Sequence, residues 1–240
     1  MSFDRHLSRR SFLSYSALTA ASALTGCASS ANTVTSGDTT IIYRSPMRLF
    51  QSMGTSSVPS GAELAVMYGP IEDGGFLIPA VPYEQIDPRY YRQQVDNTFG
   101  ERPGTIIVDT GEKYLYFVEG GGKAVRYGIG VGREGFEWKG TARVGAKREW
   151  PVWTPPPAMI KRQPELAKWR GGMPGGPQNA LGARALYLHN KGGDSGYRLH
   201  GTPEWWSIGK AMSSGCIRMM NQDVIDLYSR ANVGAKVIVK

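Results

Sequence analysis

Apolar and polar residues alternate in short runs over the second half of the chain, which is the pattern of half-buried β-strands. Residues 105–109, 114–118 and 125–131 are runs of this kind. The glycines at 120–122 separate the last two runs and predict a hairpin turn between them. This region is therefore expected to fold mainly as β-structure.

Three further strands are predicted closer to the C-terminus. Residues 185–189 and 197–200 form a strand pair joined through adjacent glycines, and residues 235–239 close the chain as a strand. The strand pattern never alternates with helices in the manner of a βαβ fold. A β-sandwich or a partly closed barrel is the expected architecture.

One helix is predicted, over residues 222–231, where apolar residues recur at helical spacing. Asn221 precedes it as a candidate N-cap, and Gly234 follows as a stop signal. The predicted fold class is thus mainly β with one packed C-terminal helix.

Two proline-rich segments interrupt or precede this pattern. Residues 150–181 form a long insertion without a regular period, and its three tryptophans indicate a lid-like loop that packs over another surface. Residues 41–103 contain seven prolines and predict an extended N-terminal arm of unknown function, with one short helix near 88–95. The compact domain is expected over residues 104–240.

The first 26 residues have the features of an export signal rather than of a folded element. Paired arginines, Arg9 and Arg10, precede a short apolar stretch, as in a twin-arginine signal. Leu-Thr-Gly-Cys then resembles a bacterial lipobox, with Cys27 as the lipidated first residue of the mature chain. Residues 27–40 predict a polar tether. Together these features predict an exported, periplasmic, lipid-anchored protein, with the outer membrane as the favoured site of the anchor.

Composition narrows the possibilities further. The chain has 240 residues, 41% of them hydrophobic and only 20% charged, which excludes a charge-rich disordered protein. Two cysteines exclude both a disulfide-stapled domain and a four-cysteine zinc site. The net charge of +8 suits an anionic polymer, and export argues against nucleic acid.

Cys216 is the residue that most strongly suggests catalysis. If Cys27 is acylated, Cys216 has no partner for a disulfide in an oxidising compartment, so it must be buried or used. A nucleophilic thiol needs a nearby base, and His200 at a strand end is the candidate. The backbone N–H groups of Gly215 and Cys216 are expected to face a developing oxyanion. Arg218, two residues further on, is expected to hold a substrate carboxylate or, alternatively, to form an ordinary ion pair.

The strings His-Gly-Thr at 200–202 and Ser-Ser-Gly-Cys-Ile-Arg-Met at 213–219 resemble the signature of the YkuD-type L,D-transpeptidases. The resemblance runs from about Pro103 to the C-terminus. One departure is that Ser214 stands where many members have histidine, so a second-histidine role is not available.

The resemblance implies a reaction on peptidoglycan stem peptides. Cys216 would attack the carbonyl of the third residue of a tetrapeptide and release D-Ala, His200 would transfer protons, and the Gly201 carbonyl would orient the imidazole ring. The family implies no metal and no organic cofactor. An amine on another stem would then form a crosslink, whereas a protein lysine or water as acceptor would give protein anchoring or a carboxypeptidase.

Less active interpretations also remain open. Cys216 can be an inert core cysteine, and a zinc site from His189, His200 and Cys216 is conceivable. A catalytically silent lipoprotein that tethers the membrane to the wall is the alternative from another functional class. The intact cysteine and histidine argue against it, since a silent module has no need for an exported free thiol.

Overall fold

The computed structural model describes residues 32–36, 39–43, 58–133, 138–213 and 215–240. The chain divides into two compact units, Met1–Arg44 and Ser45–Lys240. In the first unit, β1 (Asn32–Ser36) pairs antiparallel with β2 (Thr39–Tyr43), so a hairpin lies in the region expected as a polar tether. The predicted signal peptide and the lipidation residue Cys27 lie outside the described residues.

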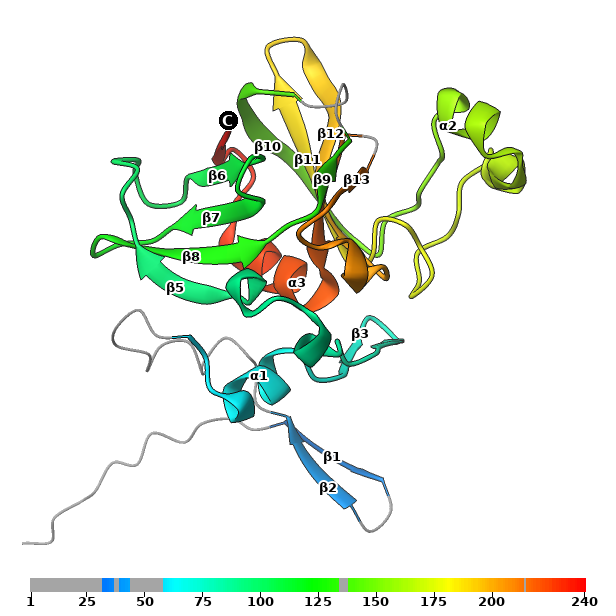
Figure 1. The fold of residues 1–240 in the computed structure, drawn as a ribbon. Helices are drawn as coiled ribbons and strands as arrows, with labels where there is room; N and C mark the ends of the chain where they lie inside the picture. Colours follow the sequence, from blue (N-terminus) through cyan, green and yellow to red (C-terminus); the bar gives the residue numbers. More distant parts are fainter. Residues whose placement is uncertain (1–31, 37–38, 44–57, 134–137, 214) are drawn as a thin grey trace, which may run out of the picture. The chain divides into compact units, whose positions relative to one another are not determined.

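A nine-stranded mixed sheet forms the body of the second unit (Figure 1). Its spatial order is β14-β12-β11-β10-β15-β6-β7-β8-β5, and the pairs β12–β14 and β15–β6 are parallel. The mainly-β prediction is confirmed, but within the described residues the strands form an open sheet with β14 and β5 at its edges rather than a closed barrel. The strands are β5 (Gln93–Asp96), β6 (Ile106–Asp109), β7 (Tyr114–Val118), β8 (Lys123–Gly128), β10 (Gly140–Glu149), β11 (Arg184–Asn190), β12 (Gly193–Thr202), β14 (Ile217–Met220) and β15 (Lys236–Val239).

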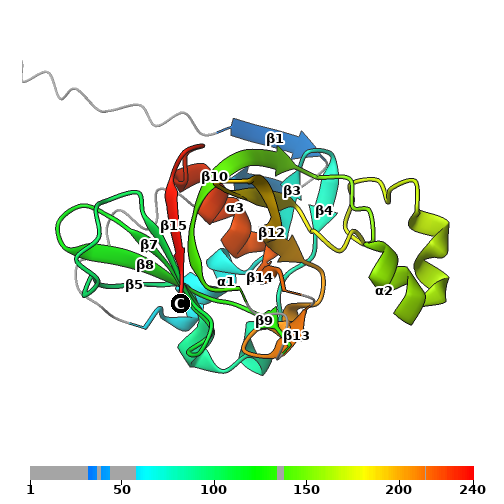
Figure 2. The ribbon, with the colours of Figure 1, turned by 90° about the horizontal axis from the view of Figure 1, so that it is seen from above.

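Two short pairs stand beside this sheet. β9 (Val131–Gly132) pairs parallel with β13 (Ala211–Ser213), and β3 (Ile71–Asp73) forms a hairpin with β4 (Phe76–Ile78). Figure 2 shows β9 and β13 close to β14, on the side of the molecule away from β7 and β8.

The helix α3 (Asn221–Arg230) follows β14 directly and packs against β11, β12 and β14. Val224 and Leu227 of α3 are fully buried in the main core, which the inward-facing strand residues complete. Each large apolar side chain withdrawn from water in this way contributes roughly 1.5–3 kcal/mol. Asn221 does not cap the helix as predicted. Its Oδ1 instead accepts a hydrogen bond from the Ala183 backbone at 2.9 Å, because the strand-to-helix turn brings it against the end of the insertion.

Residues 58–103 are folded onto the sheet rather than extended. The helix α1 (Gly61–Met67) begins with a capping box between Ser60 and Glu63. Single 3₁₀ turns follow as η2 (Tyr83–Gln85) and η3 (Pro88–Tyr90). The helix predicted near 88–95 is therefore wrong. Pro88 begins only one turn, and the next residues form β5 because they pair with β8.

A buried ionic cluster joins this segment to α3. Arg92 is 2% exposed, and its guanidinium lies 3.6 Å from Asp223 and 3.3 Å from Asp226. The Tyr68 hydroxyl accepts a hydrogen bond from the Arg92 backbone at 2.7 Å, and Tyr127 donates to Asp226 at 2.6 Å. We refer to these five residues as the α3 cluster.

The insertion at 150–181 has more structure than the sequence indicates. It contains α2 (Pro157–Arg162) and η4 (Pro164–Trp169), which stand out from the body in Figure 1. At its base, Trp153 pairs with Met173, and the Asn179 amide donates to three backbone carbonyls. No helix among the described residues is long and apolar enough to cross a membrane.

Candidate active site

The parallel pairing of β12 with β14 brings the two sequence motifs together. His200 is the register partner of Arg218, and Leu199 is the partner of Ile217, so Cys216 lies one residue before the paired segment. Ile217 and Leu199 are buried in the core, as expected for Ile217 from the sequence. Since side chains alternate along a strand, Cys216 and Arg218 point to the opposite face, as do Arg198 and His200 of β12.

His200 is kept neutral by burial, and one hydrogen bond fixes its tautomer although that bond by itself raises the pKa. The side chain is 4% exposed, and its Nδ1 lies 2.6 Å from the Gly201 carbonyl oxygen. A carbonyl only accepts, so Nδ1 carries the hydrogen and Nε2 keeps its lone pair. Burial lowers the pKa of His200 to about 4, and the charges of Arg218 and Arg198 act in the same direction. The imidazole is therefore neutral at pH 7.

Cys216 is a free, partly exposed thiol. Its Sγ lies 4.0 Å from the carbonyl oxygen of Gly196. Desolvation raises the pKa of the thiol, while a backbone hydrogen bond from Arg198 and the charges of Arg198 and Arg218 partly offset that effect. The resting thiol is protonated at neutral pH, so the site stores no thiolate–imidazolium pair before substrate arrives.

The turn before Cys216 is braced by Ser213. The Ser213 hydroxyl donates to the Cys216 carbonyl at 2.6 Å and accepts from the Gly215 N–H at 3.2 Å. Gly215 has φ of 115°, a conformation that requires glycine. The expectation that the Gly215 N–H faces an oxyanion is therefore wrong, because Ser213 already takes that donor. Ser214 lies outside the described residues.

Arg218 forms the ordinary ion pair that the sequence left open as an alternative, and its role in holding a substrate carboxylate stays a prediction. Its guanidinium forms an ion pair with Glu204 at 2.6 Å, and its backbone pairs in both directions with Gly130. One carboxylate occupies only part of the five N–H donors of a guanidinium, so Arg218 retains the capacity to hold a second anion.

Arg198 was not identified from the sequence. It binds Asp194 with two hydrogen bonds of 2.7 and 2.8 Å, and its guanidinium stacks over the Tyr187 ring at 4.2 Å. Its charge acts on both Cys216 and His200. The sequence could have indicated Arg198, because a residue two positions before His200 on a strand lies on the same face as His200.

His189 lies away from these groups. It belongs to β11, where its partners are Arg143 and Asp194, whereas Ala185 is the partner of His200. In the part of the chain that the structure describes, no three His, Cys, Asp or Glu side chains gather in a way that would hold a metal ion. A site built from His189, His200 and Cys216 is thus not supported.

Comparison with known proteins agrees with the motif. The model of the family described as "YkuD: L,D-transpeptidase catalytic domain" matches residues 103–239. A curated relative from Escherichia coli (strain K12), the probable L,D-transpeptidase ErfK/SrfK, is 34% identical over 141 residues. That match covers 55% of this chain and 42% of the relative, so the chain spans less than half of the relative's length.

Two solved structures are also similar. One, described as a probable carnitine operon oxidoreductase from Brucella melitensis, is 46% identical, with a TM-score of 0.45 over 66% of this chain and 99% of that chain. The other is an L,D-transpeptidase from Mycobacterium smegmatis, 19% identical, with a TM-score of 0.42 over 57% of this chain and 58% of that chain.

Proposed function

Because this chain belongs to the YkuD family of L,D-transpeptidase catalytic domains, we propose that it acylates itself on Cys216 with a peptidoglycan stem peptide and transfers that peptide to an amine. The substrate is a donor tetrapeptide, and the acceptor is the side-chain amine of another stem. No cofactor takes part in the proposed reaction.

The first half of the reaction starts from a neutral pair. His200 Nε2 takes the proton of the Cys216 thiol as Sγ attacks the carbonyl carbon of the third stem residue. The new C–S bond gives a tetrahedral intermediate, whose oxyanion we assign to the backbone N–H of Cys216. The imidazolium then returns its proton to the departing amine, the C–N bond breaks, and D-Ala leaves a thioester on Cys216.

The second half reverses these roles. The acceptor amine attacks the thioester carbonyl and gives a proton to His200, and the C–S bond breaks as Sγ regains a proton. The result is a new amide bond and the resting enzyme. In both halves the Gly201 carbonyl keeps the Nδ1 hydrogen in place, the task that a carboxylate performs in a serine hydrolase triad.

One observation supports this proposal most strongly. The 2.6 Å contact between His200 Nδ1 and the Gly201 carbonyl, together with a pKa lowered to about 4, keeps Nε2 available as a base on the strand that pairs with β14, directly after Cys216. A histidine with a purely structural role has no need for a single defined tautomer beside a partly exposed thiol. Arg218 and Arg198 suit a donor that carries carboxylates.

We further propose that the chain is exported and lipid-anchored through Cys27, with the outer membrane as the favoured location. This placement would bring the catalytic domain to peptidoglycan. An envelope protein lysine and water are the competing acceptors, and they would use the same acyl-enzyme.

Incubation of the full chain with purified disaccharide-tetrapeptide tests the proposal. Crosslinked dimers together with released D-Ala are the expected products, and Cys216→Ala abolishes both. A carbapenem mass adduct located on Cys216 reports activation of the nucleophile independently of the acceptor.

The other outcomes separate the alternatives. Release of D-Ala without dimers indicates water as acceptor, and incorporation of a lysine-containing protein indicates anchoring. Equal and negligible turnover in the wild type and in Cys216→Ala, without a carbapenem adduct, would contradict the acyl-enzyme proposal and favour a silent tethering protein.

A further inference from the structure

A pocket of about 250 Å³ lies at the ends of β12 and β14 that are remote from Cys216. Thr202 and Met220, the last residues of these two strands, contribute to its wall. Residues from β4 onward, from the insertion, from η5 (Trp205–Ser207) and from α3 complete it. The lining comprises Ile78, Pro79, Ala80, Val81, Pro177, Gln178, Thr202, Pro203, Trp205, Trp206, Met220, Asn221 and Gln222.

None of these lining residues carries a charge. The face that holds Cys216 differs, because Arg198 and Arg218 surround it with positive charge. A stem peptide with carboxylates suits the charged face and gains nothing from the neutral one. The occupant that suits the pocket is therefore an uncharged molecule.

Gln222 supplies a hydrogen-bond acceptor at the base of the pocket. The side chain is 3% exposed, and its Nε2 donates to the backbone carbonyls of Gly69 and Pro79 at 3.1 and 3.0 Å. These two bonds fix which end of the amide carries nitrogen. The buried Oε1 has no hydrogen-bond partner among the described residues. Oε1 is withdrawn from solvent in this structure, so a ligand hydroxyl or amide N–H would reach it only after a small shift of the Gln222 side chain, and that bond would relieve the cost of an unsatisfied buried acceptor.

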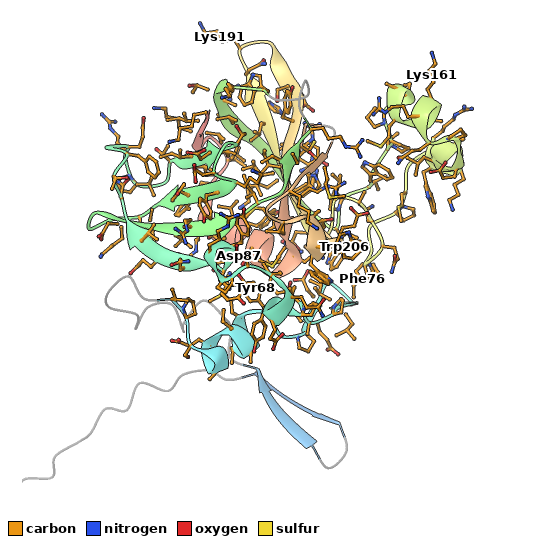
Figure 3. The ribbon with its side chains drawn as sticks, viewed as in Figure 1. Tyr68, Phe76, Asp87, Lys161, Lys191 and Trp206 are labelled. Atoms are coloured by element: carbon orange, nitrogen blue, oxygen red, sulfur yellow. The ribbon has the colours of Figure 1, made fainter. Side chains whose placement is uncertain are left out.

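Trp206 supplies a flat apolar wall. It is 47% exposed, although an indole of this size is usually withdrawn from water, and its ring meets Trp205 edge-on at a centroid distance of 5.7 Å. Trp206 is labelled in Figure 3, in the segment that follows β12. A pyranose ring has an apolar face and polar edges. The exposed indole suits the apolar face, and the uncharged amides and the hydroxyl of the pocket wall suit the polar edges.

We propose that this pocket binds one N-acetylated pyranose ring of a glycan strand. The inference rests on the proposed function, since it assigns the sugar of a substrate whose peptide reaches Cys216. Cys216 precedes Ile217, the partner of Leu199, and so lies about four residues, or about 13 Å along the strand, from Thr202. An extended stem peptide, at about 3.3–3.6 Å per residue, together with its link to the sugar can span that distance. Residues 78–81 form part of the wall, which gives the N-terminal segment a role in substrate binding.

Titration of the full chain with N,N′,N″-triacetylchitotriose, a neutral glycan without a peptide, tests the pocket directly. We expect saturable binding by calorimetry, weakened about tenfold or more by Trp206→Ala. Val233→Ala is the matched control, because Val233 is 61% exposed and lies outside the pocket. Trp206→Phe should restore most of the affinity.

A kinetic comparison separates this inference from the proposed function. Trp206→Ala should raise KM for D-Ala release from a disaccharide-tetrapeptide and leave KM for the sugar-free tetrapeptide unchanged. Cys216→Ala should bind triacetylchitotriose like the wild type, so glycan binding is measurable even if no turnover occurs. Absence of saturable binding by the wild type, or equal affinity of the wild type and Trp206→Ala, would overturn the inference.

Discussion

The candidate active site and the α3 cluster both bury ionisable groups, but the site keeps its two reactive groups neutral, whereas the cluster keeps a buried cation charged. At the site, Cys216 and His200 are kept neutral, since the thiol pKa is raised and the imidazole pKa is lowered to about 4. In the α3 cluster, Arg92 keeps a permanent charge. Burial opposes it, but the charges of Asp226 and Asp223 raise its pKa.

The difference separates reactivity from stability. A neutral pair costs little to bury and becomes charged only when a proton moves during the reaction. A buried ion pair becomes a large penalty once one partner is removed. Substitutions at the site should therefore reduce activity and spare the fold, whereas removal of the buried Arg92 cation from the α3 cluster should do the reverse.

His200→Gln should have the largest effect and confine it to activity. Glutamine is similar in size and polarity but cannot act as a base, so kcat/KM for D-Ala release should fall about 10³–10⁴-fold. The free energy of unfolding, measured by urea denaturation, should change by less than about 1 kcal/mol. A loss of stability that matches the loss of activity would remove the contrast between the two regions.

Arg92→Met should show the reverse behaviour. It removes the Arg92 charge from Asp223 and Asp226, and although Asp226 keeps its ion pair with Arg230 at 2.8 Å, the loss at Asp223 should destabilise the protein by about 3–5 kcal/mol. Denaturation at pH 7.5 measures this loss, while the activity per folded molecule should stay close to that of the wild type. The double variant Arg92→Met/Asp223→Asn should recover part of the stability, because it removes the carboxylate that lost the Arg92 charge, while Asp226 stays paired with Arg230. A change below about 1 kcal/mol in the single variant would contradict the assigned role of the cluster.

Asp223→Asn tests the pH dependence of the α3 cluster. Burial raises the pKa of Asp223 to about 7, so the folded state binds its proton more tightly than the unfolded chain does. Stability from this group is complete below about pH 4 and is lost as pH rises toward 7. The asparagine variant should lack that decline and be more stable than the wild type at pH 8 by on the order of 1–3 kcal/mol. Parallel stability curves of the two proteins from pH 5 to 8 would refute the assignment.

Local patterns in the sequence predicted the strands and the helix that carry these two regions, because each element depends on residues close together in the chain. Alternation predicts the strands around His200, and helical spacing predicts α3 to within one residue at each end. The motif identified Cys216 and His200 as the candidate pair, and their catalytic roles remain a prediction.

Features that arise from distant contacts were beyond that reasoning. Arg92 appears in the sequence as one cation in a proline-rich segment, and only the fold shows two aspartates of α3 beside it. The parallel pairing of β12 with β14 likewise joins segments that local periodicity cannot match. The Gly215 N–H was misassigned for the same kind of reason, since a hydroxyl two residues away competes for it.

The pH profile of acylation sharpens the description of the site as a neutral pair. With a pKa of about 4 for His200, the base remains available down to about pH 5. The acylation rate with a carbapenem, which involves no acceptor amine, should change less than about twofold from pH 5.5 to 8. A histidine with the ordinary pKa of about 6.5 would lose about tenfold at pH 5.5, and that result would show that burial does not lower the pKa of His200.

Arg198→Gln should have the smallest effect and act through charge alone. The backbone N–H that reaches Cys216 is unchanged in this variant, so the substitution removes only the guanidinium held by Asp194. That charge lowers the thiol pKa, so its loss should raise the pKa further and reduce kcat/KM about three- to tenfold. The pH dependence of iodoacetamide alkylation measures the thiol pKa, and Arg198→Lys should restore most of the shift. If glutamine and lysine variants both alkylate with the wild-type profile, the Arg198 charge does not reach Cys216, and desolvation, the backbone contact and the Arg218 charge set the reactivity of the thiol.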